Sequence, residues 1–289
     1  MTRNSFSRRS FIAGAAIASA ASVAPRVFAQ SSKPRVGCQV NGFAARTGDF
    51  SELLTVLPSI KSLGYAGFEC NNHFLLSELD HPAEARVKIH ASGLEFIAMH
   101  TSMAEAARND LGKLAHGGAA LGCHYVVMSA SGLSPTGNFT PDALKDKVEA
   151  LEKYGRVCNG AGIKLAYHNH QPEFANSNAE IQALADHSNP RFLSFLIDAG
   201  HAYQGGGNPA EFMRRNSSRI VGCHIKTFKN KNQQVPLGQG DFGFEDLASA
   251  IREKHWAGWL IDEEGGGPQG ANTTAVGPDR QYIRKIFGV

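Results

Sequence analysis

The stretch AYHNHQPEF, residues 166–174, concentrates side chains that bind metals or move protons. His168 and His170 offer imidazole nitrogens, and Glu173 offers a carboxylate three residues later. They come directly after the apolar run IKLAY, which is typical of a buried strand. Successive side chains of a strand point to opposite faces, so His168 and His170 share one face and Asn169 lies on the other. The stretch therefore predicts a ligand and acid–base cluster at the end of a strand, with His168 facing its centre.

Eight short apolar runs of this kind recur along the chain, separated by longer segments of helical periodicity. The intervening segments, such as PDALKDKVEALEKYGRVCNGAG, are amphipathic, and several end in glycine, as helix C-termini often do. Eight strand–helix repeats without a long linker predict a single (β/α)8 TIM barrel. An open doubly wound sheet is disfavoured because no G-x-G-x-x-G follows the first run. The runs span residues 35–40, 65–70, 94–100, 123–129, 163–169, 192–198, 220–226 and 258–264.

Polar and ionisable residues gather at the carboxyl ends of the predicted strands, whereas the amino ends carry mostly small or apolar residues. In a TIM barrel the active site is built at these carboxyl ends. One buried ionisable group can be an accident, but several that converge form a site. The residues expected at this end of the barrel are Asn41, Glu69, His100, Ser129, His168, Asn169, His170, Asp198, His201, His224, Lys226, Glu263 and Glu264.

The carboxylates and imidazoles of strands five to eight suit one divalent metal ion, with manganese, zinc and magnesium all admissible. Asp198 ends the run FLSFLID, and His224 lies within VGCHIKTF. A lone aspartate at a strand end is commonly a helix N-cap, but the position of these two residues on neighbouring strands favours ligation. Because Asp262, Glu263 and Glu264 alternate in direction, Glu263 or Glu264 must supply the last ligand, and we choose Glu263.

The chain opens with the pattern of a twin-arginine export signal. Arg8 and Arg9 precede a short, alanine-rich apolar run that ends in V-F-A. This run is too short for a comfortable transmembrane anchor, although an ordinary secretory signal or an uncleaved anchor is the alternative. We therefore expect a signal over residues 1–29, a catalytic barrel over residues 30–289, and export to the periplasm by the twin-arginine machinery without a permanent membrane anchor.

Charge and cysteine content narrow the class of partner. Residues 1–29 contain four arginines and no acidic residue, so the expected mature chain has 25 basic against 26 acidic residues. Such a balance argues against binding to nucleic acid or to an anionic membrane. The five cysteines are odd in number and scattered, without a C-x-x-C motif, so we expect buried thiols rather than a disulfide framework.

Several motifs together resemble one superfamily. The chain resembles the xylose isomerase-like TIM-barrel sugar phosphate isomerases and epimerases, especially an exported branch with twin-arginine signals. The resemblance covers residues 35–289, and the motifs that carry it, in order, are GYAGFEC, LAYHNHQPEF, FLIDAGHAYQGG, CHIKTF, PLGQGDFGFEDL and LIDEE.

The resemblance implies a ligand set. In that superfamily a metal is held by a glutamate after strand five, an aspartate after six, a histidine after seven and a glutamate after eight. The last three positions fall on Asp198, His224 and Glu263, while the first is occupied by His168 instead of glutamate. Either His168 is the ligand, or Glu173 folds back from the following loop to restore a carboxylate.

The resemblance also implies a reaction. In the epimerases two metal-bound glutamates flank a sugar carbon, and an enediolate forms between proton removal and return. With one glutamate replaced, proton abstraction next to a carbonyl remains, followed by isomerisation or epimerisation, or alternatively by β-elimination as in keto-sugar dehydratases and lyases. The candidate catalytic residues are Glu263, His170, Glu173 and Lys226, of which Lys226 could neutralise an enolate.

The expected substrate is a sugar or keto-sugar, and the residues expected to contact it are Asn41, Glu69, His100 and His201, the last by its match to the family's D-x-x-H histidine. No Walker-type loop indicates a bound phosphate. A metal-dependent endonuclease is disfavoured because KTFKNKNQQ supplies only a small basic patch. A non-catalytic carbohydrate-binding barrel, which would bind sugar without metal, is a further alternative. Related barrels often pair, so a homodimer is an option.

Overall fold

The computed structural model describes residues 33–43, 48–230, 232–264 and 273–289. The predicted signal segment, residues 1–29, lies outside them. Among the described residues, no helix has the length and apolar character needed to cross a membrane.

Eight parallel strands close into a barrel, with the spatial order β1-β10-β7-β6-β5-β4-β3-β2. The first and last strands close it, with Arg35 opposite Trp259 and Cys38 opposite Asp262. Each strand coincides with one of the eight predicted runs, so the predicted single (β/α)8 barrel is confirmed. The strands are β1 (Arg35–Gln39), β2 (Gly67–Asn71), β3 (Glu95–Ser102), β4 (Tyr125–Ser129), β5 (Lys164–His168), β6 (Ser194–Asp198), β7 (Ile220–Ile225) and β10 (Trp259–Asp262).

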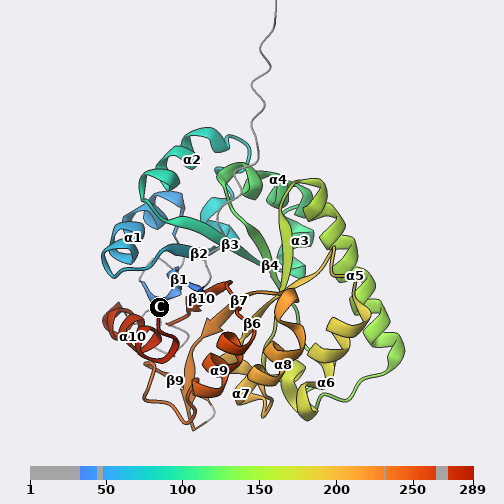
Figure 1. Cartoon of the computed structure of the whole chain (residues 1–289). Coiled ribbons are helices and arrows are strands. Elements are labelled where there is room, and N and C mark those ends of the chain that lie inside the picture. The colour runs from blue at the N-terminus through green and yellow to red at the C-terminus, as the bar shows by residue number, and fades with distance from the viewer. Residues whose placement is uncertain (1–32, 44–47, 231, 265–272) are drawn as a thin grey trace, which may run out of the picture. The chain divides into compact units, whose positions relative to one another are not determined.

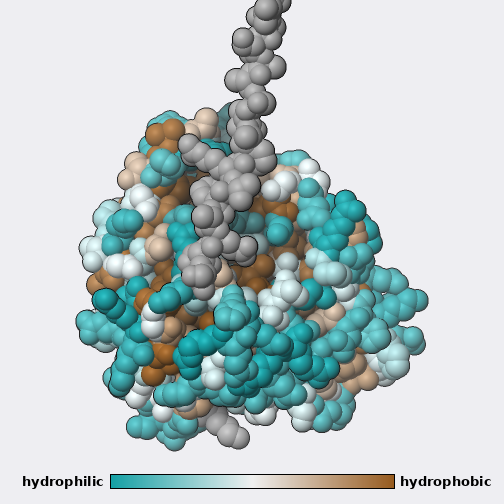
Figure 2. Space-filling view, in the orientation of Figure 1, coloured by the Kyte–Doolittle hydropathy of each residue, from teal (hydrophilic) through white to brown (hydrophobic). Residues whose placement is uncertain are grey.

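Helices surround the strands, as Figure 1 shows. Several begin at a side-chain cap: Asp49 caps α1, Thr140 caps α5 and Asn208 caps α8. The helix α5 is amphipathic, and Figure 2 shows mainly hydrophilic residues along the right-hand rim of the view, where Figure 1 places α5. The helices are α1 (Phe50–Ser62), α2 (Pro82–Ala91), α3 (Met103–Arg108), α4 (Leu111–Leu121), α5 (Pro141–Gly160), α6 (Gln171–His187), α7 (Ala199–Gln204), α8 (Pro209–Asn216), α9 (Glu245–Glu253) and α10 (Thr273–Phe287), with 3-10 turns at Val40–Gly42, Asn72–Leu75 and Ser217–Arg219.

The barrel interior is apolar below the carboxyl ends of the strands. Its buried cluster consists of Ile97, Ala98, Val127, Ala166, Leu196, Trp259 and Ile261. Ile97 fills space left by two glycines, because a Cβ on Gly37 would lie 2.2 Å from its Cδ1 and one on Gly67 would lie 2.9 Å from the same atom. Alternation along β5 then places Ala166 and His168 inward and Tyr167 outward. The inward-facing polar side chains at the carboxyl ends of the strands, such as His168, therefore lie above a packed apolar layer.

One element has no counterpart in the sequence prediction. After β7 the chain forms an antiparallel hairpin, β8 (Thr227–Lys229) with β9 (Gln233–Val235), in which Thr227 lies opposite Val235. The hairpin starts one residue after Lys226. Hence the segment that follows strand seven is held beside the barrel mouth rather than running directly into the next helix.

A buried ion pair joins two of the outer helices. Lys147 on α5 contacts Glu180 on α6 at 2.5 Å between Nζ and Oε1, and both side chains are almost fully buried. The other carboxylate oxygen of Glu180 accepts a hydrogen bond from the backbone of Leu133 at 2.7 Å. Lys147 also lies 3.8 Å from Glu173 and donates to the carbonyl of Ser131. All the polar groups of this pair thus have partners.

Candidate metal centre and active site

Three of the four predicted metal ligands meet at the carboxyl ends of adjacent strands. His168 ends β5, Asp198 ends β6 and His224 lies in β7, and all three are buried. One donor atom from each lies within 4.8 Å of the other two. Asp198 Oδ2 is 3.9 Å from His168 Nε2 and 4.0 Å from His224 Nδ1. Donor atoms at this spacing can surround one small cation.

Glu263 supplies the fourth donor. It directly follows β10, and its Oε2 lies 2.7 Å from His224 Nδ1. The neighbouring acids turn elsewhere: Asp262 accepts a hydrogen bond from the Tyr65 hydroxyl, and Glu264 contacts Asp279. Of the three consecutive acids, the chosen one, Glu263, is the one that contacts His224.

Lys226 brings a positive charge between two of these carboxylates. Its Nζ lies 2.7 Å from Asp198 Oδ2 and 2.9 Å from Glu263 Oε2. Burial alone would lower the pKa of Lys226, but the two carboxylates raise it above its ordinary value. Asp198 and Glu263 together therefore stabilise a positive charge at the position of this ammonium group.

The same contacts set the charge of the other groups. Burial alone would raise the pKa of Glu263, yet His224 and Lys226 hold it well below its usual range, so this carboxylate is ionised. Burial would lower the pKa of His224, but Glu263 and Glu69 raise it to about 10. Burial, and then the neighbouring imidazoles, lower the pKa of His168. The cluster thus combines an anionic carboxylate, Glu263, with a neutral imidazole, His168.

The donor set fits a divalent metal. Two carboxylates and two imidazoles match the mixed oxygen and nitrogen ligands of zinc and manganese better than the all-oxygen sets that magnesium prefers. His168, Asp198, His224 and Glu263 are the residues that would hold it. Lys226, which contacts two of them, would give up those contacts to the ion.

Glu69 takes a position that differs from the predicted one. It was expected to contact a substrate hydroxyl, but it is fully buried, and its Oε1 lies 2.7 Å from His224 Nε2 and 2.8 Å from His100 Nε2. Although burial would raise its pKa, these two imidazoles lower the pKa of Glu69 to about 2. The ionised carboxylate can accept a hydrogen bond from an N–H at His224 Nε2, and in this orientation of the ring Nδ1 faces Asp198 and Glu263. Carboxylates that orient metal-binding histidines in this way raise metal affinity.

Replacing Glu69 by glutamine is accordingly expected to weaken metal binding. The amide keeps the size of the side chain but removes the charge that orients His224, and outer-shell changes of this kind typically cost about 10–100-fold in affinity. Titration of the metal-free variant with Zn²⁺, followed by calorimetry, measures the change. Glu84→Gln on α2 is the control, because Glu84 forms an exposed ion pair with Lys88 on the surface. This variant should bind zinc like the wild type. Unchanged zinc affinity in Glu69→Gln would contradict the orienting role.

Glu173 is held away from the cluster by local hydrogen bonds. Its Oε1 accepts from the Tyr167 hydroxyl at 2.5 Å, and its Oε2 accepts from the backbone of His170 at 3.1 Å, so it caps the start of α6. Tyr167 points outward from β5, opposite to His168. Of the two options for strand five, this arrangement therefore favours His168 as the ligand and gives Glu173 a positioning role instead of the predicted catalytic one.

Three further histidines surround the donor atoms. The ring centroid of His170 lies 5.1 Å from those of both His168 and His201, and that of His100 lies 5.3 Å from that of His168. His201 Nε2 is 3.8 Å from Asp198 Oδ2, and burial lowers the pKa of His201. These imidazoles line the space next to the metal ligands, where the sequence places acid–base and substrate-binding groups.

Asn41 lies farther from this centre. It sits in the 3-10 turn after β1, and its side-chain oxygen accepts a long hydrogen bond of 3.4 Å from Asn71, at the end of β2. Among the described residues, the hydrogen bonds of Asn41 go to Gln39 and Asn71 rather than to the metal-ligand cluster. Its predicted role in substrate binding stays a prediction.

Asn169 and Gln204 have positioning roles that the sequence prediction did not assign. Asn169 bridges the ends of β5 and β6: its amide donates to the carbonyl of Asp198 at 3.1 Å and accepts from the backbone N–H of Asp198 at 2.8 Å. Gln204 contacts His201 Nδ1 at 3.0 Å. The location of Asn169 between two histidines could have signalled such a role, whereas nothing in the sequence singles out Gln204.

Known proteins share this arrangement of elements. Residues 57–286 match a family described as xylose isomerase-like TIM barrel. Among curated proteins, an inosose dehydratase of Clostridium botulinum is 26% identical over 57% of this chain and 66% of its own length. An inosose dehydratase of Geobacillus kaustophilus is 24% identical over 86% of this chain and 91% of its own length. The first of these alignments thus spans somewhat less than two thirds of the relative.

Solved structures show the same fold at lower identity. The IOLI protein with a bound zinc atom has a TM-score of 0.69 and 14% identity, over 88% of this chain and 98% of that chain. The 3-keto-D-glucoside 4-epimerase YcjR of E. coli, in its apo form, has a TM-score of 0.65 and 15% identity, over 89% of this chain and all of that one.

Proposed function

Because this chain belongs to the xylose isomerase-like TIM-barrel family, we propose that it is a metal-dependent enzyme that removes a proton next to the carbonyl of a keto-sugar and then eliminates a β-substituent. The observation that carries the proposal is the asymmetry of the cluster. Two carboxylates of the site, Asp198 and Glu69, are fully buried. Glu263 is the partly exposed carboxylate beside Lys226, and the other groups next to it, His168, His170 and His201, are imidazoles.

This asymmetry suits elimination better than a symmetric exchange of protons. Both contacts of Glu263 use Oε2, which leaves Oε1 to accept a proton from a carbon next to the carbonyl. The ammonium of Lys226 balances the negative charge that develops on the carbonyl oxygen. As the C–O bond to the β-substituent breaks, an imidazole N–H of His170 or His201 supplies the proton that the leaving oxygen requires. A bound divalent metal would polarise the carbonyl.

The comparisons support a ring ketone as the substrate class. The curated relatives are named inosose dehydratase, and one structural neighbour is named 3-keto-D-glucoside 4-epimerase. Each name refers to a keto-cyclitol or a keto-sugar. The epimerase also supports a second candidate, isomerisation or epimerisation of the same substrate through an enediolate. In that case an imidazole, rather than a second glutamate, would return the proton to carbon.

The proposal is tested by proton exchange. Residues 30–289, stripped of metal by a chelator and then reconstituted with Zn²⁺, Mn²⁺ or Mg²⁺, are incubated with methyl 3-keto-β-glucopyranoside in D₂O and followed by NMR. We expect metal-dependent loss of the signal of the proton next to the ketone, with release of methanol. Exchange without release would favour epimerisation or isomerisation. Sugar binding that needs no metal and brings no exchange would indicate a carbohydrate-binding barrel instead.

Export to the periplasm is part of the same proposal. It is supported by the twin-arginine pattern of residues 1–29, and it would place the enzyme where unphosphorylated sugars are met. Fractionation of cells that express the full chain, with Arg8→Lys and Arg9→Lys together as the comparison, separates export from cytoplasmic retention.

A further inference from the structure

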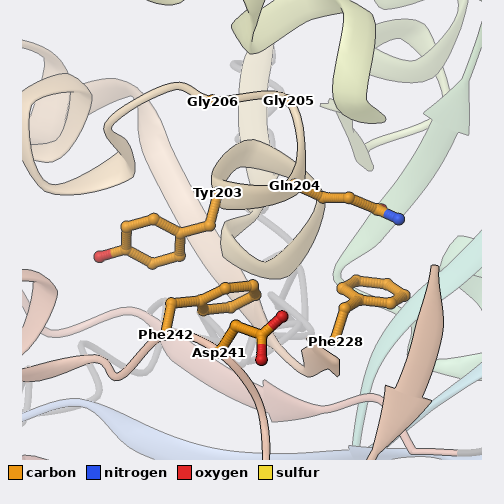
Figure 3. Close-up of a pocket in the computed structure, with 7 residues that line it drawn as sticks. All are labelled: Tyr203, Gln204, Gly205, Gly206, Phe228, Asp241 and Phe242. Carbon is orange, nitrogen blue, oxygen red and sulfur yellow. The ribbon is translucent and has the colours of Figure 1, made fainter. Parts of the chain in front are cut away.

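A cavity of about 280 Å³ lies next to the cluster, on the side of α7 and the β8–β9 hairpin. It is close to the lower end of the range of roughly 300–1,000 Å³ that is usual for small-molecule sites, which is room for one ring. Figure 3 shows the rings of Tyr203 and Phe242 on one side, Phe228 and Gln204 on the other, and the carboxylate of Asp241 between them. The backbone of Gly205 and Gly206 completes the lining.

Two side chains that line the cavity, Phe228 and Gln204, contact His201 at the edge of the metal-ligand cluster. The ring of Phe228 stacks on that of His201, with centroids 5.4 Å apart and an interplanar angle of 27°. Gln204, which also lines the cavity, contacts His201 Nδ1 at 3.0 Å. Since His201 Nε2 is 3.8 Å from Asp198 Oδ2, a single imidazole separates the cavity from a predicted metal ligand. A molecule in the cavity and a reacting ring at the cluster would therefore be near neighbours.

The lining has the chemistry that recognises a neutral sugar ring. Tyr203 and Phe242 pack with ring centroids 4.8 Å apart, and together with Phe228 they present flat apolar surfaces to the C–H face of such a ring. Asp241 and Gln204 offer hydrogen-bonding groups for hydroxyls. One oxygen of Asp241, Oδ2, accepts from the backbone of Asn230 at 2.7 Å, which fixes the direction of the carboxylate. None of the seven lining residues is basic, so a phosphate or carboxylate group has no counter-charge there.

We propose that this cavity binds the second ring of a glycoside, a neutral pyranosyl unit, while the keto-sugar ring that reacts lies at the metal-ligand cluster. The inference rests on the proposed function and deepens it, because it makes the substrate a keto-glycoside of two rings rather than a free keto-monosaccharide. Elimination would then break the bond from carbon 1 of the keto-sugar to the glycosidic oxygen. Glu263 takes the proton from carbon 2, which lies next to the ketone at carbon 3, and the double bond forms between carbons 1 and 2. The glycosidic oxygen takes a proton from His170 or His201 and leaves with the second ring as an alcohol.

The experiment compares one-ring and two-ring substrates. In the zinc-reconstituted enzyme, kcat/KM for 3-keto-cellobiose is expected to exceed that for methyl 3-keto-β-glucopyranoside about tenfold, the scale of one aromatic contact. The double variant Tyr203→Ala with Phe242→Ala is expected to lose most of this ratio. Tyr154→Ala, at a partly buried tyrosine on α5 outside the cavity, is the matched control and should keep it. Equal kcat/KM for the two substrates in the wild type, or an equal loss for both in the double variant, would overturn the proposal.

A binding measurement separates this inference from the proposed function. Saturation-transfer NMR with unreactive cellobiose, whose non-ketone rings undergo no elimination, reports contact with the cavity even if neither keto-sugar is turned over. We expect transfer to the reducing-end ring in the wild type and its loss in the double variant. Absence of turnover together with this transfer would reject the reaction and keep the cavity as a sugar site, whereas equal transfer in wild type and variant would reject the sugar site.

Discussion

Asp198→Ala is expected to reduce the metal content of the purified protein from about one divalent ion per chain to near zero and to abolish activity on keto-sugars. Asp198 contributes the donor atom that lies within 4.0 Å of both His168 and His224, so its loss removes the centre of the ligand set. Because even outer-shell changes cost about 10–100-fold in metal affinity, loss of a direct ligand should cost at least about 100-fold. Mass spectrometry of the metal content, beside Glu263→Ala, measures the effect.

Two further variants separate ligand loss from misfolding. Asp198 also caps α7, since its Oδ1 accepts from the backbone of His201 at 2.8 Å. Asp198→Asn retains this cap while removing the anionic ligand, so it should fold like the wild type and still lose the metal. Asp186→Ala, at an exposed aspartate on α6, should bind metal normally. Full metal content in both Asp198 variants would show that the cluster is not the metal site.

Lys147→Met is expected to be the most damaging change outside the active site, lowering the free energy of unfolding by about 3–5 kcal/mol. The substitution keeps the bulk of the side chain but leaves Glu180 buried without its counter-ion. For a domain of this size each kcal/mol shifts the melting temperature by roughly 2–4 °C, so a fall on the order of 10 °C should be visible by calorimetry. Lys145→Met, which removes an exposed pair with Glu149 on the same helix, should change it little.

The pH dependence of this variant provides an independent check. Burial raises the pKa of Glu180 even though Lys147 lowers it, and without Lys147 the pKa should rise further. A carboxyl whose pKa is raised by folding stabilises the protein below its unfolded pKa and loses that contribution as pH rises through the folded value. The deficit of Lys147→Met relative to the wild type should therefore be larger at pH 8 than at pH 5. Adding Glu180→Gln should recover part of it, and a deficit independent of pH would argue against an uncompensated carboxylate.

The strands were predictable from sequence because they depend on local patterns, and apolar runs located every barrel strand. Alternation left Glu263 or Glu264 as the last predicted ligand, and the chosen one, Glu263, lies against His224. Tertiary contacts that no pattern encodes account for the differences. From the sequence, Glu69 is expected to contact substrate, but closure of the barrel brings it to His224, 155 positions away along the chain. Glu173 is a candidate ligand from the sequence, but Tyr167 and the backbone of His170 hold its carboxylate by hydrogen bonds.

The cavity shows a second limit of sequence reasoning. Tyr203, Phe228 and Phe242 come from a short helix, an unpredicted hairpin and the loop that follows it, so no periodicity links them. From the sequence alone, aromatic residues in such segments cannot be distinguished from ordinary core residues. Only their convergence beside His201 distinguishes them.

The pairing of the first barrel strand with the last one has a consequence for the order of events during protein synthesis. Residues 35–39 are translated early, yet their partners in β10 emerge about 220 residues later, and Glu263 follows them directly. A ribosome-bound chain therefore carries an open barrel with three of the four predicted metal ligands until residues 259–263 are made. Stoichiometric metal loading would then report that the barrel has closed. Chains that end before Trp259 would lack both the closing strand and the last predicted ligand, and we expect them not to retain the ion.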